Sequence, residues 1–241
     1  MLHRLRRHPI SVSAHFRHSL VLAYAVPVEA VEPLLPPKLE PDGHGDLGFA
    51  AAAFVQTEGM RPSFLPRSLG LDFFLAGYRI FVRVAGRPSL RGLYIIRSDT
   101  DSRLLAFLGN ATTTYRYGTA DASFWLENGT LRVEVSPGVK VVADLESRPA
   151  QLPASSPFSS IPEARRFAGS LPYTFHHEPE TGRLLGVRGV RSSWDPQPVS
   201  VVVAELAFFA ELFGEAATLA NAFYVEGIDY RWERGRLLAE G

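Results

Sequence analysis

An arginine between two tyrosines, Tyr115-Arg116-Tyr117, is the polar cluster of this sequence best suited to chemistry. A guanidinium can bind a carboxylate through two parallel hydrogen bonds, and a phenol can donate or accept a further one. The cluster therefore suits a pocket for a small organic anion. The alternative is a strand whose successive side chains point to opposite faces without forming a site.

Amine chemistry has little support in the sequence. The chain has two lysines, Lys38 and Lys140, and no cysteine. A lysine becomes nucleophilic when burial or a neighbouring cation lowers its pKa. Lys38 follows two prolines in an expected exposed turn, Lys140 lies in an expected strand, and neither has a cationic neighbour in the sequence. We therefore expect neither amine to form a Schiff base.

Motifs for cofactors and metals are weak. Residues 43–48, Gly-His-Gly-Asp-Leu-Gly, match the dinucleotide fingerprint, but no strand–helix unit surrounds them, so we expect a turn. His15 and His18 would share a face only in a helix, and the adjacent His176 and His177 would diverge in a strand. No acidic residue stands at a suitable spacing to complete a metal site. We predict that the protein uses neither a cofactor nor a metal.

The elements that must position these residues are mostly strands. Short apolar or alternating segments between turn residues predict a mainly β fold with few helices. Asn128-Gly129 predicts a type I′ hairpin turn, whereas residues 49–56 fit either an alanine-rich helix or a buried strand. The predicted strands are 19–26, 78–84, 90–98, 113–127, 131–135, 139–145, 173–177, 184–190, 199–207 and 222–232. The predicted helices are 27–35 and 101–108, the second capped by Asp99 or Thr100.

Length and composition indicate one globular domain over residues 1–241. We expect residues 1–14 to form a solvated N-terminal tail. Residues 146–172 are rich in proline and serine and predict a long loop with at most a short helix around residues 163–167. Such a loop is either a lid over a binding site or a plain surface connection.

Charge and hydropathy exclude several classes of protein. With 25 basic and 25 acidic residues the chain has no positive excess, so we expect no binding to nucleic acid. The apolar runs 19–25 and 199–213 are too short or too interrupted for a signal peptide or a membrane span. The lack of cysteine is compatible with a cytoplasmic protein, which is our expectation.

The order of several motifs resembles the acetoacetate decarboxylase superfamily. Within Tyr24–Asp42, the segments Val28-Glu29-Ala30-Val31 and Leu34-Leu35-Pro36-Pro37-Lys38-Leu39-Glu40 resemble the early strand, helix and turn of that family. The likeness continues through residues 92–99, 194–198 and 220–226, and it is greatest to the YqjF-like branch, a group of unknown function. The resemblance implies a cone-shaped antiparallel β-barrel with a closed pocket and a few short helices.

The resemblance also implies where a site would lie. In the decarboxylase one lysine of an adjacent pair forms the Schiff base, and that pair matches Tyr115-Arg116 here, where no imine can form. A catalytic glutamate of the family matches Leu75, which cannot act as an acid or base. An arginine that faces the family's pocket matches Arg17, between His15 and His18.

Three functions remain open on this basis. The first is a pocket for a small carboxylate or carbonyl-bearing metabolite, bound by Arg17, Arg116, Tyr115, His15 and His18. The second is an enzyme without a Schiff base, such as a hydratase, dehydratase or aldolase acting on a keto acid. Tyr115 would then be the general acid or base, and Arg17 would stabilise an oxyanion. The third is a non-catalytic interaction module whose pocket is filled by its own aromatic side chains; a homo-oligomer is compatible with all three.

Overall fold

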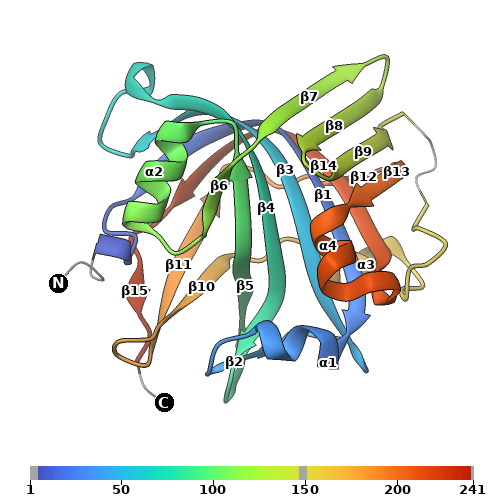
Figure 1. The fold of residues 1–241 in the computed structure, drawn as a ribbon, viewed down its shortest axis with the longest axis horizontal. Helices are drawn as coiled ribbons and strands as arrows, with labels where there is room; N and C mark the ends of the chain where they lie inside the picture. Colours follow the sequence, from blue (N-terminus) through green and yellow to red (C-terminus); the bar gives the residue numbers. More distant parts are fainter. Residues whose placement is uncertain (1–4, 147–150, 240–241) are drawn as a thin grey trace.

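The computed structural model describes residues 5–146 and 151–239, and its largest sheet curls into a ring (Figure 1). Neighbouring strands of the ring follow the order β14, β1, β3, β4, β5, β10, β11, and β11 pairs with β14 again. Within these residues the pairs are antiparallel, apart from the parallel pair of β5 and β10. The ring strands are β1 (Val12–Pro27), β3 (Leu47–Pro62), β4 (Leu71–Val84), β5 (Arg87–Thr100), β10 (Tyr173–Glu178), β11 (Arg183–Arg191) and β14 (Thr218–Trp232).

Smaller elements surround the ring. A second antiparallel sheet stands beside it in Figure 1, in the order β13, β9, β8, β7. Its strands are β7 (Asp121–Glu127), β8 (Thr130–Ser136), β9 (Val139–Asp144) and β13 (Ser200–Leu206). Short strands at the margins of the ring are β2 (Leu39–Pro41), β6 (Tyr117–Thr119), β12 (Gln197–Pro198) and β15 (Arg236–Leu237). The helices are α1 (Val28–Val31), α2 (Arg103–Thr112), α3 (Ile161–Ala168) and α4 (Ala207–Phe213), with 3₁₀ turns at Glu32–Leu34, Arg67–Leu69 and Gly214–Ala216.

The two faces of the ring have different roles, as β4 illustrates. Tyr78 and Ile80 point outward and are buried in the main hydrophobic core, which also includes residues of the second sheet and α4. Gly77 and Arg79 alternate with them and point inward. The main core therefore lies outside the ring, and the inner face is left to line a cavity.

Residues 151–172, between β9 and β10, close one end of the ring. Phe158, Ala164 and Ala168 are buried against inward-facing residues such as Phe49 and Phe81. Phe158 stacks on Phe49 with ring centroids 5.4 Å apart. The predicted loop 146–172 contains the short helix that the sequence allowed around residues 163–167, observed as α3, and it contributes to the core. Its residues 147–150 lie outside the described residues.

The N-terminal segment is also more ordered than a solvated tail. The Arg7 guanidinium donates two 2.7 Å hydrogen bonds to the buried Glu178 carboxylate. His8 is buried, and β1 begins at Val12, inside the predicted tail 1–14. The apolar residues at positions 9, 10 and 12 line the cavity, which explains why the segment is held. Residues 1–4 lie outside the described residues.

Other local predictions separate by whether they depend on long-range packing. The turn at Asn128-Gly129 is confirmed, with φ values of 47° and 70°. Residues 49–56 form part of β3 rather than a helix, because both faces of this strand are buried. The predicted strand 113–127 is instead a loop followed by β6 and β7.

Helix α4 was not predicted, and the N-cap of α2 is Ser102, which accepts a hydrogen bond from the Leu105 amide. No helix in the described part of the chain has the length and apolar character needed to cross a membrane.

Candidate functional site

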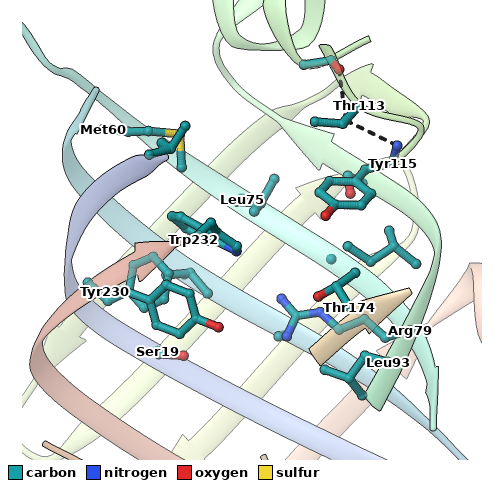
Figure 2. A pocket seen from close by; sticks show the side chains of 18 of the residues that line it. Ser19, Met60, Leu75, Arg79, Leu93, Thr113, Tyr115, Thr174, Tyr230 and Trp232 are labelled. Carbon is teal, nitrogen blue, oxygen red and sulfur yellow. Dashed lines mark hydrogen bonds between the residues drawn. The ribbon is translucent and has the colours of Figure 1, made fainter. Parts of the chain in front are cut away.

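The inner face of the ring encloses a cavity of about 540 Å³ (Figure 2). Strands β1, β3, β4, β5 and β14 contribute most of its wall. Helix α2 and the segment around Ile10 line it from one end, and residues 169–171, which follow α3, line it as well. The side chains that face it are mostly apolar. Its few polar groups therefore decide what it can bind.

Arg79 is the most distinctive of these polar groups. Its side chain points from β4 into the cavity in Figure 2, and its Nε is buried without a hydrogen-bond partner among the described residues. Burial lowers the pKa of Arg79 from its ordinary value, and the nearby Arg191 cation acts in the same direction. An arginine nevertheless stays protonated at neutral pH. The cavity therefore holds a permanent cation with an unused donor.

Two further arginines line the cavity, and each donates to the backbone. Arg191 donates to the Leu171 carbonyl at 3.2 Å, and its guanidinium carbon lies 4.4 Å from the ring centroid of Trp194. Arg61 donates to the Gly59 and Leu65 carbonyls at 2.8 and 3.0 Å. Among the described residues that line the cavity there is no Asp or Glu. The cavity is therefore positively charged, and nothing in its described wall neutralises Arg79.

Tyr115 reaches the cavity because the end of α2 fixes the loop that carries it. The Thr113 hydroxyl donates to the Gly109 carbonyl at 2.8 Å and accepts from the Tyr115 amide at 3.3 Å. Asn110 then holds the backbone of Tyr117 through two 2.9 Å hydrogen bonds. Tyr115 and Tyr117 thus face the cavity together, with ring centroids 6.4 Å apart.

The phenols of Tyr115 and Tyr117 stay protonated at neutral pH. Burial raises the pKa of Tyr115 far above its ordinary value, and it raises the pKa of Tyr117 to about 12. Such phenols are hydrogen-bond donors rather than bases. Tyr230 lines the same cavity and stacks on Phe16 with centroids 5.0 Å apart. The polar groups around Arg79 therefore add donors and acceptors but no negative charge.

The other residues predicted for the site lie outside the cavity. The pairing of β1 with β3 has an irregularity between Phe16 and His18. Phe16 and Ser19, three residues apart, both face inward, so the irregularity leaves Arg17 and His18 on the outside. The Arg17 side chain is 65% exposed, with its Nη1 3.8 Å from Glu58.

Both predicted histidines have partners on this outer face. His15 Nδ1 lies 2.8 Å from a carboxylate oxygen of Asp229. His18 forms a short hydrogen bond with the Tyr224 hydroxyl and stacks on Phe124. The structure therefore separates His15, Arg17 and His18 from Tyr115, because a bulge in β1 changes which residues face inward.

Arg116 is also separated from Tyr115, despite being its neighbour. Arg116 has a φ of 52° and is exposed, while the tyrosines on both sides of it face the cavity. The arginines that line the cavity are instead Arg61, Arg79 and Arg191, which the sequence reasoning did not select. A signal for Arg79 existed, since it alternates with Ile80 and Val82 in a strand whose other face is apolar. Arg79 lies inside the protein because both faces of β4 are covered by other parts of the chain.

Neither lysine lines the cavity. Lys38 is exposed with a φ of 72°, and Lys140 is an exposed residue of β9 in the second sheet. Within residues 5–146 and 151–239, His, Asp and Glu side chains do not gather into a group that could hold a metal ion.

The fold is that of acetoacetate decarboxylase-like proteins, which confirms the mainly β, barrel-type fold expected from the resemblance. Acetoacetate decarboxylase from Legionella pneumophila aligns over 94% of this chain and 87% of its own, with a TM-score of 0.60 and 14% identity. An acetoacetate decarboxylase-like enzyme from Sphingomonas wittichii RW1 aligns over 98% and 94%, with a TM-score of 0.60 and 14% identity. The enduracididine biosynthesis enzyme MppR, in complex with pyruvate, aligns over 96% and 91%, with a TM-score of 0.58 and 15% identity.

The chain belongs to the DUF2071 family, described as an uncharacterized conserved protein, whose model matches residues 13–229. This match confirms the resemblance to a family of unknown function. A search of curated protein sequences finds no match. The identities to the solved structures are low, so those structures establish the fold only. The activity has to be inferred from the site.

Proposed function

We propose that this protein binds a small organic carboxylate inside the ring, with Arg79 as the main anchor. The observation that carries the proposal is a cavity lined by arginines and, in its described wall, by no carboxylate. Arg79 Nε is buried and unpartnered, and a buried cation without a counter-charge is costly. A carboxylate would supply two acceptors in the geometry that a guanidinium matches.

Neighbouring donors support the same ligand class. Tyr115, Tyr117 and Tyr230 face the cavity, and their hydroxyls can donate to a second oxygen of the ligand. Arg191 raises the positive potential further, although its guanidinium also lies over Trp194. MppR, which has a similar fold, is described in complex with pyruvate, itself a carboxylate. The likeness supports the ligand class and not a shared reaction.

The proposal excludes a Schiff-base mechanism. An imine needs an amine at the ligand, and neither Lys38 nor Lys140 lines the cavity. Borohydride reduction in the presence of pyruvate should therefore add no mass to the protein. An adduct on either lysine would contradict this part of the proposal.

A second candidate is an enzyme that uses Tyr115 in the same cavity. The raised pKa of its phenol favours a role as a hydrogen-bond donor or general acid and opposes a role as general base near neutral pH. A keto acid held by Arg79 would place its carbonyl among such donors. Turnover of a keto acid that Tyr115→Phe abolishes, with binding retained, would favour this candidate over binding alone.

A module that works only through its surface would be expected to have a pocket filled by its own aromatic side chains. The cavity of about 540 Å³ is not filled in this way. A ligand-binding function therefore explains the inner face better than a module that works only through its surface.

Thermal unfolding in the presence of carboxylates tests the proposal. Wild-type protein, Arg79→Met and Arg17→Met should be compared against monocarboxylates, keto acids and hydroxy acids. A ligand at about 100 times its dissociation constant stabilises the native state by roughly 2.7 kcal/mol. We expect this stabilisation in wild type and in Arg17→Met, and its loss in Arg79→Met. Stabilisation that persists in Arg79→Met and disappears in Arg17→Met would overturn the proposal.

A further inference from the structure

We infer that the ligand is a monocarboxylate with an extended apolar body, such as a medium-chain alkanoate, rather than a short oxo acid. The inference rests on the proposed function and names the class of ligand for the same cavity. It follows from where the polar groups lie in the cavity, from its size and from its apolar rim.

Several polar side chains lie on the same side of the cavity as the Arg79 guanidinium, while Tyr115 and Arg61 line other parts of the wall (Figure 2). In Figure 2, Ser19, Thr174 and Tyr230 lie on the same side of the pocket as the Arg79 guanidinium. Met60 lies on the opposite side of this view, and Leu75 lies between Met60 and Arg79. A carboxylate held at Arg79 would therefore have its remaining atoms directed along apolar side chains.

The volume also exceeds what a short acid needs. Cavities of about 300–1,000 Å³ enclose ligands of drug size, and this cavity has about 540 Å³. A three-carbon acid would leave most of the apolar wall facing water. An alkyl or aryl group that fills the space would remove that wall from water, which is favourable in proportion to the area covered.

The rim of the cavity is apolar as well. Leu69, Leu104 and Leu108 line the cavity and are 64%, 51% and 43% exposed. Large apolar side chains in such exposed positions mark surfaces that meet apolar partners. At this rim they would be covered by the end of a chain that extends out of the cavity. A ligand whose second end is charged would gain nothing there.

Titration of the purified protein with straight-chain monocarboxylates from acetate to dodecanoate tests the inference. We expect the dissociation constant to fall about fourfold for each added methylene until the cavity is filled. Octanol, which lacks the carboxylate, should bind at least tenfold more weakly than octanoate. The 1,8-dicarboxylate of the same length should also bind more weakly than octanoate, because it would bury a second charge.

Two variants that narrow the cavity near Leu75 and Met60 provide a second test of the preference for long chains. Leu75→Trp, or Met60→Trp if the first does not fold, should weaken octanoate binding at least tenfold and change butyrate binding less than twofold. Leu126→Trp, on the outer strand β7, is the matched control and should change neither.

The outcomes separate this inference from the proposed function. Dissociation constants that do not change with chain length, or tighter binding of pyruvate than of octanoate, would overturn the inference while leaving carboxylate binding in place. If no carboxylate binds at any length, or octanol binds as well as octanoate, the proposed function fails as well.

Discussion

The guanidinium of Arg79 lies over the α-carbon of Gly77, two residues earlier on the same face of β4. A β-carbon added at Gly77 would lie 3.1 Å from Nη2 and 3.3 Å from Nε of Arg79. Glycine at this position therefore leaves the space in which the arginine folds back along the strand. The proposed anion site therefore depends on the lack of a side chain at Gly77 as well as on Arg79 itself.

Gly77→Ala is predicted to weaken carboxylate binding about tenfold, because the new methyl group would displace the Arg79 guanidinium from its place in the cavity. The atoms that must move are the flexible end of a side chain, so the melting temperature of the free protein should not fall. Calorimetric titration and thermal unfolding measure the two effects. Gly186→Ala, whose β-carbon would make only ordinary contacts with Leu238 and Phe175, is the control. Equal binding by Gly77→Ala and wild type would show that Arg79 is not the anchor.

Replacing the buried cation should stabilise the free protein. Arg79→Met removes a partly buried guanidinium whose Nε is buried and unpartnered, and we expect the free energy of unfolding to rise by about 1–2 kcal/mol. Arg191→Met should instead lower it, because Arg191 donates to the Leu171 carbonyl and packs on Trp194. Urea unfolding of both variants without ligand provides the measurement. A loss of stability in Arg79→Met would mean that the protein itself satisfies this cation.

The N-terminal segment is predicted to contribute to stability through Arg7. Arg7→Ala would remove two 2.7 Å hydrogen bonds from the buried Glu178 carboxylate and should therefore lower the free energy of unfolding. The loss should be smaller than for a fully buried pair, since Arg7 is partly exposed and Thr181 also donates to Glu178. Arg6→Ala, an exposed neighbour, should cost less than about 0.5 kcal/mol. Equal effects of the two substitutions in chemical denaturation would contradict this role.

Acid should destabilise the protein through His176. Burial lowers the pKa of His176 to about 4, and the neighbouring His177 acts in the same direction. Between pH 6.5 and about 4 the unfolded chain binds a proton at this histidine that the folded protein does not. Stability from this group is therefore present above pH 6.5 and is lost as the pH falls towards 4. His176→Gln should reduce the fall in melting temperature between pH 7 and pH 5. An unchanged fall in the variant would assign the acid sensitivity to other groups.

Local sequence patterns account for the strands and for part of the site. Alternation in residues 78–84 places Arg79 and Phe81 on one face of a strand, and Asn128-Gly129 specifies its turn, because both depend only on neighbouring residues. These features required no knowledge of what packs against them.

The tertiary structure decided which of these faces surrounds a cavity. Arg17 lies outside because β1 has an irregularity in its pairing with β3, and such a bulge depends on the register of strands far apart in the sequence. Arg79 lies inside because the pairing of β11 with β14 completes a ring around the inner face of β4. The sequence by itself determined most of the strands, the alternation of residues 78–84 and the supply of arginines and tyrosines. Which arginine is buried was set by long-range strand pairing, because a one-residue shift in register moves every side chain of a strand to its other face.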